Sequence, residues 1–147
     1  MRSGYSEKNV LFILTILECI EKIHLYITPF GESVGFFTAM DQQPYNACCH
    51  LLLAVSEDSK KIEESLKEEF SFIAWDQISG LRNRIAHDYR GIDYEIVFQI
   101  CRFELDSLRD ACINMLKLLK VSKVNLVRLV GLPHYRHLGY LKDLGFF

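Results

Sequence analysis

The chain has 147 residues, of which 50% are hydrophobic and 24% are charged. This balance is typical of one globular domain that buries most of its apolar surface, and it excludes a disordered chain. The formal net charge of −2 excludes a protein that coats nucleic acid through a broad basic face, but not a local basic site. Only three prolines and eight glycines interrupt a chain rich in helix formers, which favours an all-α fold.

The start of the chain does not resemble a signal peptide, because charged residues flank its apolar run and no small-residue cleavage site follows. The apolar run, residues 10–17, is too short to span a bilayer. We therefore expect a cytoplasmic protein that makes no contact with a membrane.

The cysteines lie in apolar, helical stretches and are predicted to be free buried thiols in a reducing compartment. Cys48, Cys49 and His50 resemble metal ligands only faintly, since adjacent side chains on a helix point about 100° apart and no second ligand pair follows. We expect neither a metal nor another cofactor. The set comprises Cys19, Cys48, Cys49, Cys101 and Cys112.

The first half of the chain predicts two long helices. The first begins after an N-cap at Ser6 and runs to about Tyr26, and it is apolar on more than one face, so it must be covered on two sides. Residues 32–43 form a connector of ambiguous structure. Pro44 suits the first turn of the second helix, whose apolar stripe continues through Leu66 and whose later half is a charged, solvated face.

Two further helices and a tail follow. Apolar residues at steps of three and four predict a third helix within residues 70–89, and Gly91 ends it. Asp93 is expected to cap a fourth helix that runs to about Lys120. We expect residues 1–120 to form the helical domain. Residues 121–147 are too apolar for a disordered tail and are expected to dock on the bundle or on a partner. The third-helix stripe consists of Trp75, Ile78, Leu81 and Ile85.

The candidate chemistry lies on the third helix, where the buried stripe leaves Arg82, Asn83, Arg84 and His87 on other faces. Arginine is a permanently charged, bidentate clamp for phosphate. Histidine titrates near neutral pH and can move a proton to or from a ribose hydroxyl or a leaving oxygen. These groups suit phosphodiester cleavage without a metal. A hydrogen-bonded helix end is the structural alternative, because an arginine five residues before a histidine is common by chance.

Helix geometry restricts this interpretation. Arg82 and His87 are five residues apart, about 140° around an ideal helix, so their side chains diverge on one chain. The two groups can converge if the helix ends near His87, or if two copies of the helix meet in a symmetric dimer. Dimerisation would also double the local positive charge.

The stretch Trp75–Tyr89, followed by Gly91-Ile92-Asp93, resembles the signature of the HepT-like proteins, which are ribonuclease toxins of the HEPN superfamily. The family motif is Arg, four residues, His, any residue, Tyr, and Arg82, His87 and Tyr89 fill it, with Asn83 after the arginine. The resemblance extends over about residues 8–120. It includes ILECIEKIHLYI, VSEDSKKI with Glu57 where the family often has a glutamate, and the start of the fourth helix at residues 93–97.

The resemblance implies a four- to five-helix bundle that dimerises so that two motifs share one cleft. It implies metal-independent cleavage of tRNA or mRNA with Arg82 and His87 as catalytic residues, supported by Asn83 and Arg84. It also implies a cognate antitoxin, a minimal nucleotidyltransferase of the MNT type, which silences the toxin by transferring AMP to Tyr89. Such an adduct would place negative charge where RNA phosphate should bind.

The sequence departs from the family in two places. Val55-Ser56-Glu57-Asp58 replaces the usual Ile-Gly-Glu-Ala of the second helix, and residues 121–147 extend beyond the typical family length. Neither touches the motif. A non-catalytic subunit that presents RNA or a nucleotide to a nucleotidyltransferase, or a purely structural helical adaptor, remains as an alternative.

Overall fold

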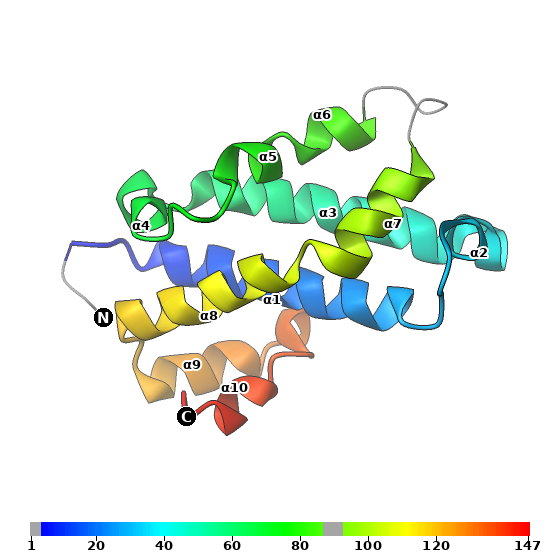
Figure 1. The fold of residues 1–147 in the computed structure, drawn as a ribbon. Helices are drawn as coiled ribbons and strands as arrows, with labels where there is room; N and C mark the ends of the chain where they lie inside the picture. Colours follow the sequence, from blue (N-terminus) through cyan, green and yellow to red (C-terminus); the bar gives the residue numbers. More distant parts are fainter. Residues whose placement is uncertain (1–3, 87–92) are drawn as a thin grey trace.

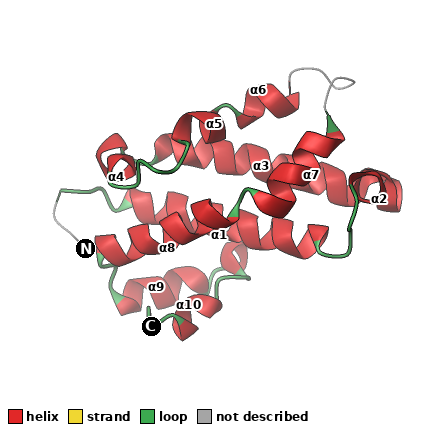
Figure 2. Cartoon of the chain, viewed as in Figure 1, coloured by secondary structure: helices red, strands yellow, loops and turns green. Residues whose placement is uncertain are grey.

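The computed structural model describes residues 4–86 and 93–147, and in these ranges the chain consists of helices and connecting loops without a strand (Figure 2). The predicted all-α fold is confirmed. None of the helices in these ranges is both long and apolar enough to cross a membrane. His87, Tyr89 and the predicted helix end at Gly91 lie outside the described residues.

Helix α1 (Lys8–Ile27) lies at the centre of the bundle and is buried on several faces. Helix α3 (Gln43–Lys61) returns along one side of it, and α8 (Asp106–Leu119) runs along the other (Figure 1). The expectation that the first helix is covered on two sides is therefore confirmed within a single chain. Its buried apolar side chains are Val10, Ile13, Leu14, Ile16, Leu17, Cys19, Ile20, Ile23 and Ile27.

The connector after α1 folds into α2 (Ser33–Thr38) and a short 3-10 turn, η1 (Ala39–Gln42). Phe36 of α2 is fully buried and packs at ring distances of 5.8–6.0 Å on three other aromatic rings, Phe30, Tyr45 and Phe98. This aromatic cluster closes the end of the α1–α3 hairpin, and α3 then begins with a proline in its first turn, as predicted.

The second predicted helix is too long, because the chain breaks between α3 and α4 (Glu64–Glu68). Asn9 of α1 is 1% exposed, and its side-chain oxygen accepts a 3.1 Å hydrogen bond from the Glu63 backbone N–H. Its amide also donates to the Glu63 carboxylate. A buried amide must have its hydrogen-bonding groups paired. The Asn9 side chain finds its partners at Glu63, and these bonds stabilise the turn between α3 and α4. Lys67 then donates to the Ser59 carbonyl in the last turn of α3.

The third and fourth predicted helices are each divided. The third begins at Trp75, within the predicted range, but it is interrupted at Gly80, which separates α5 (Trp75–Ser79) from α6 (Leu81–Ala86). The fourth consists of α7 (Tyr94–Phe103) and α8, which meet at a kink. Asp93 caps α7 as predicted, since its carboxylate accepts a 2.9 Å hydrogen bond from the Glu95 N–H.

Residues 121–147 form α9 (Lys123–Val130), the turn η2 (Pro133–Tyr135) and α10 (Tyr140–Asp143), which lie below α1 and α8 in Figure 1. The tail contacts α1 through polar groups: the Tyr135 hydroxyl lies 3.2 Å from the Thr15 hydroxyl, and the His137 N–H donates to the buried Glu18 carboxylate at 2.7 Å. Its buried leucines, which join the common core, are Leu126, Leu129, Leu138 and Leu141.

The leucines of the tail allow a test of this packing. Leu138 is fully buried, whereas Leu144 is 47% exposed. We expect Leu138→Ala to lower the free energy of unfolding by about 2–5 kcal/mol, because it removes buried methyl groups and leaves a cavity. Leu144→Ala, the matched control, should change it by no more than about 0.5 kcal/mol. Urea unfolding followed by circular dichroism measures both, and equal effects would contradict a docked tail.

Candidate functional site

Helix α6 carries the motif arginine, and its orientation follows from two apolar residues. Leu81 and Ile85 are four positions apart, on one face of the helix, and are 4% and 3% exposed. Arg82, Asn83 and Arg84 occupy the positions between them and are exposed. The prediction that a buried stripe leaves these three polar residues on other faces is confirmed. A six-residue helix is too short to be stable alone, so its position depends on contacts with α3.

Two neighbouring residues of α3 hold the segment that carries the motif. Ser56 is fully buried, and its hydroxyl donates a 3.1 Å hydrogen bond to the Ser79 carbonyl at the end of α5. The next residue, Glu57, places its carboxylate oxygen 3.5 Å from a guanidinium nitrogen of Arg82. The first contact fixes backbone just before Gly80, and the second directs the motif arginine toward α3. One turn of α3 thus positions both α5 and α6.

The electrostatics of this pair leave Arg82 accessible. Lys60 lies 3.4 Å from the same Glu57 oxygen, and its hydrogen bond and charge, followed by those of Arg82, hold the pKa of Glu57 below its ordinary value. The Arg82 side chain is 65% exposed. An exposed ion pair is weak and screened by salt, so a phosphate can replace Glu57 as the partner of Arg82. Glu57 therefore orients the guanidinium without occupying it permanently.

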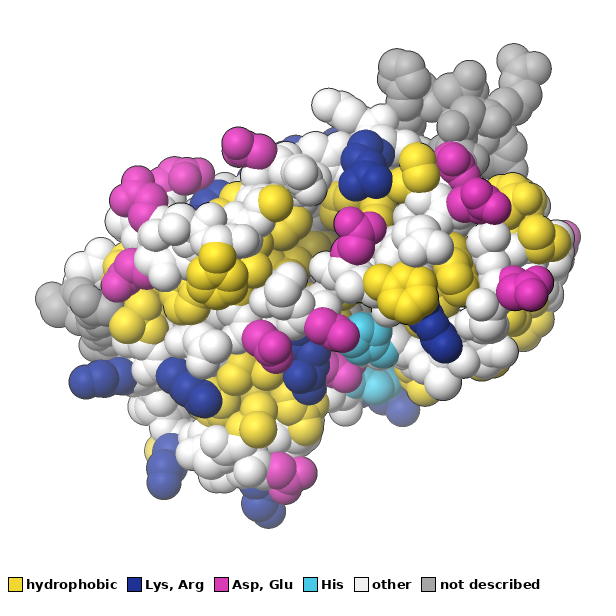
Figure 3. Space-filling model, in the orientation of Figure 1, with side chains coloured by type: hydrophobic (Ala, Val, Ile, Leu, Met, Phe, Trp, Pro, Cys, Tyr) yellow, Lys and Arg dark blue, Asp and Glu magenta, His cyan; other side chains and the backbone are white. Residues whose placement is uncertain are grey.

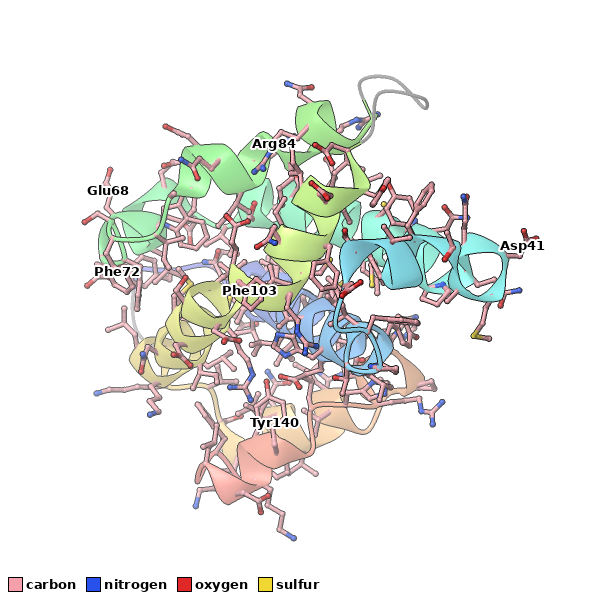
Figure 4. All side chains as sticks on the ribbon, turned by 45° about the vertical axis from the view of Figure 1, so that its right-hand side comes forward. Asp41, Glu68, Phe72, Arg84, Phe103 and Tyr140 are labelled. Atoms are coloured by element: carbon pink, nitrogen blue, oxygen red, sulfur yellow. The ribbon has the colours of Figure 1, made fainter. Side chains whose placement is uncertain are left out.

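Arg84 points to a different side of α6. It is two residues after Arg82, about 160° away around an ideal helix. It lines a cavity of about 290 Å³ between the α5–α6 segment and α7–α8, together with polar side chains that include Gln77, Glu104 and Ser107. Figure 4 shows Arg84 on α6, above α7. Figure 3 shows hydrophobic side chains exposed between the α5–α6 segment and α7–α8. The two arginines thus serve different surfaces.

Of the residues predicted for the site, the structure places Arg82, Asn83 and Arg84 together on one exposed turn. His87 and Tyr89 lie outside the described residues, so the distance from Arg82 to His87 and the roles of all five residues stay predictions.

Sequence reasoning missed the contribution of two residues. Ser56 lies on the same helix face as Leu52, Val55 and Ser59, and a small hydroxyl on a buried face signals a hydrogen bond. No sequence pattern marked Glu104, because it reaches the cavity lined by Arg84 through the kink between α7 and α8.

The cysteines lie within the helices of the bundle. Within residues 4–86 and 93–147, no three side chains of His, Cys, Asp or Glu lie close enough together to hold a metal ion. The thiols are free, and burial raises the pKa of Cys19 and Cys49 to about 11 and that of Cys112 to about 12. The prediction of free thiols is confirmed, and all but the half-buried Cys49 are buried.

The fold and site define a helical bundle that exposes a short helix with two arginines on its surface. A family model described as Ribonuclease HepT-like matches residues 16–115 of the chain. The chain therefore belongs to the HepT-like ribonuclease family, whose members are enzymes that act on RNA. The matched region runs from α1 into α8 and includes the motif, and it ends before α9.

Three relatives from curated collections are similar over shorter stretches. Putative RNase MJ0125 of Methanocaldococcus jannaschii is 26% identical over 105 residues, which is 65% of this chain and 90% of that protein. Putative RNase MJ1216 of the same organism is 25% identical over 71 residues, 48% of this chain and 59% of its own length. Putative RNase TTE0752 of Caldanaerobacter subterraneus subsp. tengcongensis is 28% identical over 54 residues, 37% of this chain and 48% of its own length. No solved structure is significantly similar.

The thiol environments predict slow chemical labelling. At about pH 8 a thiol with a pKa near 11 is ionised in about one molecule in a thousand, and only the thiolate reacts. We expect the native protein to resist labelling by a disulfide reagent for many minutes and the guanidinium-unfolded protein to react at once with all five cysteines. Rapid labelling of Cys19 or Cys112 in the native protein would contradict the burial of α1 and α8.

Proposed function

We propose that the chain is a metal-independent endoribonuclease in which Arg82 and His87 are the catalytic residues. The observation that carries this assignment is the exposed turn of α6, which presents the motif arginine to solvent while Leu81 and Ile85 hold its backbone. Arg82 clamps the scissile phosphate and stabilises its developing negative charge. This work needs a guanidinium that can leave its partner, and the exposed pair with Glu57 supplies one.

His87 moves the protons of the reaction. The ribose 2′-hydroxyl attacks the adjacent phosphorus, its proton passes to a base, and the bond from phosphorus to the 5′-oxygen breaks. A 2′,3′-cyclic phosphate and a 5′-hydroxyl result, and the leaving 5′-oxygen takes up a proton from an acid. An imidazole titrates near neutral pH, so His87 can be the base or the acid. Asn83 orients the phosphate or His87, and Arg84 supports RNA binding.

The active site is shared between two copies of the chain. Arg82 and His87 diverge on one helix, and a homodimer that pairs two α6 helices brings an arginine of one copy toward a histidine of the other. Pairing also doubles the positive charge of the turn, which compensates for the slightly negative chain.

The family resemblance supports a role in a toxin–antitoxin pair that acts on cytoplasmic tRNA or mRNA. The antitoxin is an MNT-type nucleotidyltransferase, and the modified residue is Tyr89. The transfer forms a bond between the tyrosine oxygen and the α-phosphorus of ATP, releases pyrophosphate and gives up the phenolic proton. The adduct repels RNA phosphate electrostatically two residues from His87.

Cleavage by purified protein tests the catalytic assignment. In buffer with a chelator, we expect the wild type to cut RNA to products with cyclic-phosphate ends. Arg82→Ala removes charge stabilisation and His87→Ala removes proton transfer, so each should lower the cleavage rate by about 100-fold or more. Arg128→Ala is the matched control, since Arg128 is exposed on α9 and its guanidinium contacts only Asn125 among the hydrogen bonds of the described residues.

Equal cleavage by wild type, Arg82→Ala and His87→Ala would overturn the assignment. Absence of cleavage by the wild type, with intact RNA binding, would instead favour a non-catalytic subunit of a nucleotidyltransferase complex.

Modification of Tyr89 is tested by mass. Co-expression with a nucleotidyltransferase encoded next to this chain should raise the intact mass in steps of one AMP and abolish RNA cleavage, because the adduct occupies the phosphate site. Tyr89→Phe lacks the acceptor oxygen and should keep the unmodified mass. AMP-sized steps that persist in Tyr89→Phe would move the modification to another residue.

A further inference from the structure

The cavity beside Arg84 has the composition of a site for a small, flat and polar ligand. Its apolar wall is formed by one residue each from α3, α5 and α8, which are Val55, Ile78 and Leu108. Its polar groups come from different elements: Arg84 from α6 and Glu104 from the kink between α7 and α8. Convergence of a few polar side chains on an apolar concavity is the usual form of a ligand site.

We propose that this cavity binds one unstacked base of the RNA substrate, with Arg84 on the adjoining phosphate and Glu104 on the edge of the base. The proposal rests on the proposed ribonuclease function and deepens it, because it assigns residues that select the sequence to be cut. A volume of about 290 Å³ is at the lower end of ligand sites, which suits a single base and excludes a stack of several.

Phe72 adds a stacking surface. It lines the cavity just before α5 and is 73% exposed, although a phenylalanine usually avoids water. Proteins that bind single-stranded RNA place exposed aromatic rings beside basic groups so that bases stack on them. Figure 4 shows Arg84 near the top of the molecule and Phe72 at its left edge, with Phe103 of α7 below Arg84.

Glu104 determines which base fits. The residue is exposed at the C-terminal end of α7, and a carboxylate accepts hydrogen bonds but does not donate them. A base that turns an amino group toward it gains a charge-assisted hydrogen bond. Cytosine has such a group where uracil has a carbonyl oxygen, which a carboxylate repels. The site therefore favours cytosine over uracil, two bases of nearly equal size.

An apolar side chain from a second protein fits the same cavity less well. It would satisfy Val55, Ile78 and Leu108, but it would strip water from Glu104 and Arg84 without replacing their hydrogen bonds, which is costly. A nucleotide satisfies both the apolar wall and the charged rim.

Binding and cleavage together test the proposal. Cytidine and uridine monophosphates are titrated into His87→Ala, which is designed not to cleave, and chemical shifts are followed by NMR. We expect cytidine monophosphate to bind about tenfold more tightly and to shift signals around the cavity, a difference typical of one good contact to a base. Glu104→Gln should bring the two affinities within about twofold, because an amide can donate to the uracil oxygen. Glu32→Gln, at the exposed N-cap residue that precedes α2, is the control and should keep the preference.

A second variant blocks the cavity without changing its charges. Ala74 is exposed and lines the cavity, so Ala74→Phe fills the space from its rim, and it should abolish the preference for cytidine while leaving the circular dichroism spectrum unchanged. With the otherwise wild-type chain, the rate on poly(C) relative to poly(U) should fall in both Glu104→Gln and Ala74→Phe.

The outcomes separate this proposal from the proposed function. If the wild type cuts no RNA but Glu104→Gln still removes the preference in binding, the base site stands and the nuclease assignment fails. If the wild type cuts RNA and neither variant changes the base preference, the base site is wrong. The base site is also wrong if Ala74→Phe changes only the dimer dissociation constant measured by sedimentation, because a second protein chain then covers the cavity.

Discussion

The burial of α1 is the constraint on which the rest of the structure depends. A twenty-residue helix that is apolar on several faces cannot remain in water, since each fully buried aliphatic side chain is worth about 1.5–3 kcal/mol. The chain covers it with α3 on one side, α8 on another and the tail on a third. The short helices α5 and α6 pack on α3 rather than on α1.

This second layer explains the properties of the site. Because α5 and α6 rest on α3, the backbone near the motif is positioned by Ser56 and by the buried pair Leu81 and Ile85. The polar side chains of α6 remain outside the core and keep their exposure. A phosphate-binding site needs both features: a rigid backbone limits the entropy lost on binding, and exposed guanidinium groups lose little hydration before they meet the ligand. A motif buried in the first layer would lack the second feature.

Periodic apolar residues predicted the four long helical stretches, because burial of one face is a local property of the sequence, but not the short helices α2, α9 and α10. They did not predict where helices break. The turn at Glu63 depends on Asn9, which is 54 residues away in the sequence. A local pattern of apolar residues cannot reveal such a distant contact. The exposed face of α6 could be predicted from Leu81 and Ile85 for the same local reason. The cavity beside Arg84 could not, because Glu104 comes near only through the kink between α7 and α8.

The tail restricts how two copies of the chain can meet. Its backbone N–H at His137 satisfies the Glu18 carboxylate, which is 3% exposed and would be costly to bury without a partner. Residues 121–147 therefore occupy the side of α1 and α8 that lies opposite α6 in Figure 1. In the dimer proposed above, the copies meet over α6, where the Arg82 of one chain can approach the motif of the other, and the side of α1 and α8 under the tail takes no part. The same approach would place the cavity beside Arg84 at the rim of the shared cleft, within reach of the nucleotides that flank the scissile bond.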